Sequence, residues 1–314
     1  RVTPETQVPE VEGTWEVAKD STFQSIINNG DFSTSPKQDY TVKIDVTKLE
    51  EGVTYFYRFN ALGATSQIGR TRTAAQNSSK LKLGVVSCSN YEWGYFNAYK
   101  HLAKEKDLQA VLHLGDYIYE YGTGTYGDTT IGRINIPRHE IITLTDYRDR
   151  YAQYHLDKDL QAVHASHPFI NIWDDHEISN NSYSTGAQNH QADEGDYETR
   201  KNIAKQVFYE WLPIRESAKH FRDFDFGNLA ELVMLDERLE GRTAPADSLT
   251  DPVLNEKSHK LLGDIQFEWL ANKLMTSQAK WKIIGNQVIY SYLDWGFPGF
   301  HINLDSWDGY PYEQ

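Results

Sequence analysis

Cysteine and long apolar runs are scarce in this chain of 314 residues, and each absence excludes a class of protein. Cys88 is the only cysteine, so no internal disulfide bond can form. No run approaches the roughly 18 apolar residues of a membrane helix, so no transmembrane segment is predicted. The residues that follow Arg1 do not resemble a signal peptide, which by itself says nothing about the compartment.

Basic residues are also few, with 31 Lys and Arg against 45 Asp and Glu and a formal net charge of -14. A chain with this charge repels a nucleic-acid backbone, so binding to a nucleic-acid duplex is not expected. An acidic protein that handles an anion usually needs metal ions to hold it, although the charge could also serve solubility alone. The 20 Tyr residues have two possible roles, in packing at a solvated surface or in a carbohydrate-binding face.

The first part of the chain, residues 1–75, has the pattern of a small β domain. Polar and apolar residues alternate over 40–46 and again over 53–60, as in half-buried strands. The turn that precedes Tyr55 resembles the tyrosine corner of fibronectin-type β-sandwiches. Only three or four strands are predicted, so we expect the sandwich to be incomplete. Residues 74–80 are small and polar, which is typical of a linker.

The second part, residues 81–314, alternates strands with helices and therefore predicts a layered α/β domain. Strands are expected at 81–87, 110–114, 169–173, 222–226, 231–236 and 281–284, with a hairpin turn at 227–228. Helices are expected at 93–106, around Tyr147, Tyr151 and Tyr154 before the strand at 169, at 197–212, and at 264–279 with Asp264 as its cap. Residues 121–145 are rich in Gly and Thr and predict a loop over the sheet edge.

Polar residues follow four of these strands immediately. Cys88 follows the first, Asp116 and Tyr119 follow the second, Asp174-Asp175-His176-Glu177 follows the third, and Asn286 follows the last. Open α/β proteins bind their ligands at this edge of the sheet. The sequence therefore predicts a functional site with Asp116 at its centre.

The ligand types of two strand ends favour Fe(III). Asp116 can bridge two metal ions, a phenolate from Tyr119 selects highly charged iron, and Cys88 would add a thiolate to the same ion. Each residue also has a plain structural reading. Tyr119 can simply pack, Asp116 can cap a turn, and Cys88 can lie in the core.

A second ion is predicted beside the first. Oxygen ligands from Asp175 and Asn286, with Asp116 shared, suit Ca(II) and less well Mn(II) or Mg(II). The absence of histidine from this set argues against zinc. His176 is the candidate to protonate or hydrogen-bond a reacting oxygen. One of Asp174 and Asp175 is expected to face the site and the other to face back into the loop.

Two cations that share a carboxylate, with a histidine nearby, form a site at which a metal-activated hydroxide can attack a phosphoryl centre in line. Rival chemistries lack their motifs. There is no G-x-S-x-G, no Walker loop and no G-x-G-x-x-G after a strand, which argues against serine hydrolases, P-loop enzymes and Rossmann oxidoreductases.

Several stretches of the chain together resemble the PhoD-type alkaline phosphatases of the calcineurin-like metallophosphoesterase superfamily, which are related to purple acid phosphatases. The stretches are Val85-Val86-Ser87-Cys88-Ser89-Asn90, His113-Leu114-Gly115-Asp116-Tyr117-Ile118-Tyr119-Glu120, Trp173-Asp174-Asp175-His176-Glu177, Ile284-Gly285-Asn286-Gln287 and Asn303-Leu304-Asp305-Ser306-Trp307-Asp308-Gly309-Tyr310-Pro311. The resemblance implies a two-sheet αββα sandwich preceded by a small fibronectin-like β-sandwich domain. It also implies a secreted or periplasmic phosphomonoesterase and phosphodiesterase with Fe(III) and Ca(II).

The resemblance assigns roles by position. Cys88, Asp116 and Tyr119 match the iron ligands, with Asp116 bridging. Asp175 stands in place of the asparagine of the superfamily's Asn-His-Glu motif, and His176 matches its histidine. Asn286 stands where relatives carry a metal-binding histidine. The family continues into a Gly-Asp-x-His-type motif that this chain lacks, so we expect the catalytic domain and its metal site to be incomplete.

Other functions remain open on the sequence alone. Arg148 and Arg150 lie on a predicted helix and are candidates to bind phosphate, although surface arginines are commoner. The chain could be a dedicated phosphodiesterase, such as a phospholipase D-like enzyme. It could also be a non-catalytic calcium- or glycan-binding protein on the same scaffold. The sequence does not predict an oligomeric state.

Overall fold

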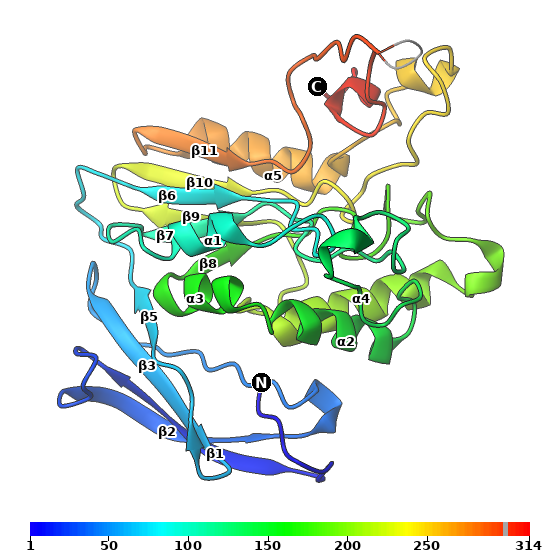
Figure 1. The fold of residues 1–314 in the computed structure, drawn as a ribbon. Coiled ribbons are helices and arrows are strands. Elements are labelled where there is room, and N and C mark those ends of the chain that lie inside the picture. The colour runs from blue at the N-terminus through cyan, green and yellow to red at the C-terminus, as the bar shows by residue number, and fades with distance from the viewer. Residues whose placement is uncertain (298–300) are drawn as a thin grey trace.

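The computed structural model describes residues 1–297 and 301–314, and Figure 1 shows an N-terminal β sheet beside a larger body of layered sheets and helices. The strands are β1 Val11–Ala18, β2 Ile26–Thr34, β3 Thr54–Ala61, β4 Ala64–Thr65, β5 Gly69–Arg72, β6 Leu83–Val86, β7 Ala110–His113, β8 Phe169–Asn171, β9 Arg222–Phe226, β10 Ala230–Met234 and β11 Trp281–Gly285. The α-helices are α1 Asn97–Leu102, α2 Leu144–Tyr154, α3 Lys158–Ser166, α4 Tyr197–Trp211 and α5 Gly263–Thr276. In this described part of the chain, none of the helices combines the length and the apolar character needed to cross a membrane.

The N-terminal strands form one antiparallel sheet in the order β2-β1-β3-β4, with β5 also paired to β3. Tyr55 is fully buried, and its hydroxyl accepts a hydrogen bond from the backbone N of Glu50 at 2.9 Å, which confirms the predicted tyrosine corner. Among the described residues no second sheet lies against this one, so the expected sandwich is represented by a single sheet.

The strand predicted at 40–46 is wrong, because this segment contacts the larger body instead of a neighbouring strand. Lys43 Nζ donates to the carbonyl oxygen of Ile214 at 3.1 Å, and Asp45 pairs with Arg215 at 2.6 Å. The segment therefore ties the N-terminal sheet to the larger body.

The larger body contains two three-stranded sheets, β6-β7-β8 and β11-β10-β9. Strands β6, β7 and β8 are parallel, β10 and β11 are parallel, and β9 is antiparallel to β10. Side chains alternate along each strand. Leu112 of β7 and Leu232 of β10 meet in one core between the sheets. Val111 faces a second core with α2, α3 and α4, and Val233 a third core near α5. The predicted α–β–β–α layering is confirmed (Figure 1).

The helices differ from prediction mainly at their ends. The helix expected at 93–106 is reduced to α1. The periodicity of Tyr147, Tyr151 and Tyr154 belongs to α2, and a second helix, α3, follows with Asp157 as its cap, which accepts hydrogen bonds from two backbone N–H groups. Helix α5 begins at Gly263, so Asp264 lies in its first turn rather than capping it. Helix α4 and the hairpin of β9 and β10 lie where the sequence predicted them.

Candidate metal centre

Backbone hydrogen bonds continue beyond β6 and β7 and hold the two following loops together. Cys88 N donates to the carbonyl oxygen of Gly115 at 3.1 Å, and Ser89 N donates to that of Asp116 at 2.8 Å. Cys88 and Asp116 have φ values of 59° and 55°, a region that residues other than glycine seldom occupy. Such strain persists where the surrounding structure enforces it, and it commonly marks functional sites.

Gly115 allows the loop after β8 to approach this pair of loops. Its φ is 101°, and a Cβ atom there would lie 2.2 Å from the backbone N of Asp174. A side chain at this position is therefore excluded on both conformational and steric grounds. The close approach brings the third strand end, with Asp175 and His176, next to Asp116.

Asp116, Asp175 and His176 form the candidate metal centre. Each is buried and offers one ligand atom, and these atoms all lie within 4.8 Å of one another. The Tyr119 hydroxyl donates to Oδ2 of Asp116 at 3.0 Å. Oδ1 of Asp116 is buried and has no hydrogen-bond partner in the described part of the chain. A buried, unpartnered carboxylate oxygen is costly, so it fits a metal ion at this position.

The electrostatics of the centre also call for a cation. Burial and the neighbouring carboxylates of Asp175, Asp174 and Glu177 raise the pKa of Asp116 well above its ordinary value, against the lowering effect of His176. Burial, followed by the charge of Asp116, raises the pKa of Tyr119. Both groups bind a metal in their deprotonated forms, and a positive ion would favour those forms.

Glu120 orients His176. Its Oε2 lies 2.7 Å from Nδ1 of His176, and its Oε1 accepts from Asn180 N at 2.6 Å and from Asn189 Nδ2 at 2.8 Å. Burial lowers the pKa of His176, but the charges of Asp175, Glu120 and Asp116 outweigh it, and the pKa is raised well above its ordinary value. Because Glu120 binds Nδ1, Nε2 is the ring nitrogen that remains free to face the cluster or a ligand.

Glu177 anchors the backbone of two loops. Its carboxylate accepts from the backbone N of Asp116 at 3.0 Å, of Tyr117 at 2.5 Å and of Asp174 at 2.9 Å. Burial raises its pKa to about 7, although these hydrogen bonds act in the opposite direction. Neither Glu120 nor Glu177 was given a role from the sequence, although both belong to the motifs that carry the resemblance.

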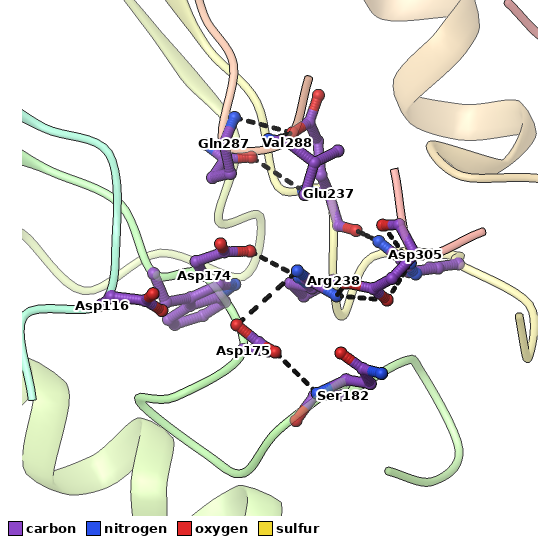
Figure 2. Close-up of polar contacts among 12 residues, drawn as sticks. Asp116, Asp174, Asp175, Ser182, Glu237, Arg238, Gln287, Val288 and Asp305 are labelled. Atoms are coloured by element: carbon purple, nitrogen blue, oxygen red, sulfur yellow. Dashed lines mark hydrogen bonds and ion pairs between the residues drawn. The ribbon is translucent and has the colours of Figure 1, made fainter. Parts of the chain in front are cut away.

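Arg238 decides which aspartate faces the centre (Figure 2). The buried guanidinium binds Asp174 through Nε at 2.5 Å, and its Nη2 lies farther from Asp175, at 3.6 Å. Asp174 is thereby held by Arg238, and Asp175 is the aspartate that lies with Asp116 and His176. The sequence had left this choice open.

The segment near Asp305 completes the charge network. Asp305 pairs with Arg238 at 2.9 Å and with Arg242 at 2.5 Å. Nearby, the buried carboxylate of Glu237 accepts from Gln287 N at 2.7 Å and from Val288 N at 2.9 Å (Figure 2). These residues were missed from the sequence. The signal was present, since Asp236-Glu237-Arg238 follows β10 as directly as the predicted ligands follow their strands.

Cys88 and Asn286 lie near different partners. Cys88 is partly open to solvent, and burial of its thiol followed by the charge of Asp116 raises its pKa to about 12. The Asn286 carbonyl oxygen accepts from Nε1 of Trp307 at 2.9 Å, and its amide donates to Val288 O. Cys88 therefore feels the charge of Asp116 but does not belong to the group of Asp116, Asp175 and His176, and the Asn286 side chain is bound to Trp307.

Arg148 and Arg150 make contacts away from the cluster. Arg148 pairs with Glu210 at 2.6 Å and donates to the carbonyl oxygen of Lys37 at 2.8 Å, which joins α2 to the N-terminal part. Arg150 is fully buried and donates to the carbonyl oxygens of Ile136 and Tyr119. Arg150 therefore supports the loop that carries a predicted metal ligand.

The fold is of the metallophosphoesterase type. It has four layers, helix, sheet, sheet and helix, and carboxylates and a histidine gather at the strand ends. A purple acid phosphatase isolated from yellow lupin (Lupinus luteus) seeds has a related structure, with a TM-score of 0.56 at 15% identity. The match covers 95% of this chain and 50% of that chain. At this identity the likeness concerns the fold alone.

The chain belongs to the PhoD-like phosphatase family, which matches residues 83–314, and the N-terminal domain of that family matches residues 1–75. Alkaline phosphatase D of Bacillus subtilis (strain 168) is 38% identical over 319 residues, which cover 95% of this chain and 53% of that protein. A solved structure of PhoD matches with a TM-score of 0.88 at 35% identity, over 98% of this chain and 62% of that chain. The chain thus spans about half the length of the curated relative.

Proposed function

We propose that this protein hydrolyses phosphate esters at a binuclear metal centre built around Asp116. The observation that carries the proposal is the convergence of Asp116, Asp175 and His176, with a buried Asp116 oxygen that has no partner among the described residues. Membership of a phosphatase family supports the reaction class.

We assign Fe(III) to Cys88, Asp116 and Tyr119, and Ca(II), or less well Mn(II) or Mg(II), to Asp116, Asp175 and Asn286. A thiolate, a phenolate and a carboxylate together favour Fe(III), whereas carboxylate and amide oxygens suit the second ion. The bound ions would supply an activated water and neutralise charge on the phosphate. Asn286 would exchange its hydrogen bond with Trp307 for the metal.

His176 supplies the proton or hydrogen bond. Its Nδ1 is held by Glu120, so Nε2 is the nitrogen that can face a leaving-group oxygen. Neighbouring carboxylates raise its pKa, and a protonated imidazole at this place would act as a general acid. Phosphate binding by Arg148 or Arg150 stays a prediction, and either arginine would have to leave its present partners to do so.

Monoesters and diesters are both proposed substrates. A dedicated phosphodiesterase of the phospholipase D type would hydrolyse only the diester, so rates on 4-nitrophenyl phosphate and bis(4-nitrophenyl) phosphate separate the two. A calcium- or glycan-binding protein would contain calcium without iron and hydrolyse neither ester. Export to the periplasm or outside the cell is proposed on the resemblance to PhoD-type enzymes.

The proposal is tested with the full chain supplied with Fe(III) and Ca(II). We expect the protein to hydrolyse both esters and to bind the metals in a fixed ratio of ions to protein. His176→Ala should lower kcat by about 100-fold or more. Exposed His139, whose Nε2 lies 3.2 Å from Asp146, provides the control variant His139→Ala. Full activity of His176→Ala, or hydrolysis that is insensitive to metal removal, would contradict the assignment.

A further inference from the structure

The loop between β7 and α2 carries Tyr126 over the candidate metal centre. The Tyr126 ring lies 6.3 Å from the His176 ring, nearly parallel at 21°, and 5.9 Å from the Tyr119 ring. Tyr121 lies 5.5 Å from Tyr126 on the same side. Tyr126 is nevertheless 47% exposed. The ring thus covers the centre on one side and remains open to solvent on the other.

Glu92 fixes this loop in place. The residue is fully buried, and its carboxylate accepts from the backbone N of Gly124 and of Asn135, both at 2.9 Å. Its carbonyl oxygen accepts from Asp128 N at 3.0 Å. These bonds lie on both sides of Tyr126 in the chain, so the position of the ring is set before any ligand binds. Preorganisation of this kind reduces the entropy lost on binding.

Trp93 forms a corner with Tyr126. It follows Glu92 directly, is 57% exposed, and its ring lies 6.0 Å from the Tyr126 ring at an angle of 81°. Two rings at this angle can accept a third planar ring, which stacks on one and presents its edge to the other. A small aliphatic group would fill neither face.

We infer that Trp93 and Tyr126 form a subsite for a planar aromatic ring in the leaving group of the phosphate ester, as in a nucleoside 5′-monophosphate. The inference rests on the proposed function, because the Tyr126 ring lies against the ring of His176, which belongs to the cluster with Asp116 and Asp175. A leaving group whose oxygen contacts His176 is therefore next to Tyr126, whose ring lies 6.0 Å from that of Trp93. A single mononucleotide avoids the repulsion that the acidic chain exerts on a duplex.

The test compares two monoesters that release the same phosphate, adenosine 5′-monophosphate and glycerol 3-phosphate, with the metal-loaded full chain. We expect Trp93→Ala to lower the ratio of their kcat/KM values, nucleotide over glycerol ester, by about tenfold, since base stacking has this magnitude. Trp93→Phe keeps a ring and should restore most of the ratio. Trp281→Ala is the matched control. Trp281 is 62% exposed and is the first residue of β11, whereas the candidate site follows the last residues of the strands.

A second measurement separates failure of the subsite from failure of the proposed function. Saturation-transfer NMR detects binding of adenosine, which has the ring and no phosphate, and does not depend on hydrolysis. Hydrolysis of both esters with an unchanged ratio in Trp93→Ala overturns the subsite and leaves the phosphatase assignment standing. If neither ester is hydrolysed, the proposed function fails, and adenosine binding decides the subsite: its loss in Trp93→Ala supports the subsite, and its retention overturns it.

Discussion

Nη1 of Arg238 and Oδ1 of Asp305 lie 2.9 Å apart although 67 residues separate them in the chain. The other nitrogens of the same guanidinium face Asp174 and Asp175 (Figure 2). A residue far along the chain thus fixes the side chain that selects which aspartate faces the candidate metal centre.

Asp305→Asn should destabilise the protein by about 3 kcal/mol, because it removes the carboxylate shared by two buried guanidinium groups. Urea unfolding measures the loss. Asp308→Asn is the control, since Asp308 lies on the same segment and takes part in none of the ion pairs of the described residues. If both variants unfold at the same urea concentration, the network is not a source of stability.

Tyr119→Phe should lose iron, the visible absorption of an iron–phenolate, and at least about tenfold in activity. The variant removes both the hydroxyl that donates to Asp116 and the proposed phenolate ligand. Metal analysis and the visible spectrum give readouts that do not depend on turnover. Tyr292→Phe, at an exposed tyrosine, is the control. Unchanged iron content and rate in Tyr119→Phe would remove the residue from the ligand set.

Gly115→Ala should cost at least about 2 kcal/mol, because both its positive φ and the contact with the Asp174 backbone oppose a Cβ atom. Gly132→Ala provides the comparison. Its φ is 78°, and a Cβ atom there meets nothing within 4 Å, so it should lose about 1 kcal/mol for conformation alone. The difference between the two variants in lost unfolding free energy, measured by thermal unfolding, gives the steric contribution at Gly115. Equal losses in the two variants would show that the loops at Gly115 and Asp174 can move apart.

Acid should destabilise the protein through His155 and His164, whose Nε2 atoms lie 3.3 and 2.8 Å from the Tyr117 hydroxyl. Nδ1 of His155 lies 2.9 Å from Tyr151 O and must donate to it, so the Tyr117 hydroxyl donates to His155 and accepts from His164. Burial lowers the pKa of His155 to about 4 and that of His164 well below its ordinary value. Both histidines are therefore neutral in the folded protein.

The direction of this pH effect follows from the difference in proton binding between the folded and unfolded protein. Below about pH 6.5 the unfolded chain binds protons that the folded protein does not, so the free energy of unfolding falls as the pH falls, by up to about 1.4 kcal/mol per pH unit for each histidine. The double variant His155→Gln, His164→Gln should show a flatter dependence between pH 6.5 and pH 5, whatever its stability at pH 7. His101→Gln, on the exposed side of α1, should keep the slope of the parent protein. An unchanged slope in the double variant would exclude these histidines as the source.

The features that the sequence predicted correctly are those that a local pattern determines. Buried strands that end abruptly in polar residues placed Asp116, Asp175 and His176 at one sheet edge, and the structure brings these three together. The loop over the sheet edge was also visible, because its Gly and Thr content departs from both strand and helix patterns.

Features that depend on partners distant in sequence were not predictable. The alternation of 40–46 satisfies a strand pattern, yet Lys43 finds its partners in the larger body. Arg238 and Asp305 carry no local signal for each other, and only the fold makes them neighbours. The sequence could therefore name both Asp174 and Asp175 without showing which one Arg238 engages.

The path from Asp305 through Arg238 to Asp174 also sets an order for biosynthesis. The charge network cannot close until the segment with Asp305 has been synthesised, long after Asp116 and Asp174. Until the Asp305 segment arrives, Arg238 lacks the carboxylate that fixes it, so the choice between Asp174 and Asp175 is made late in folding.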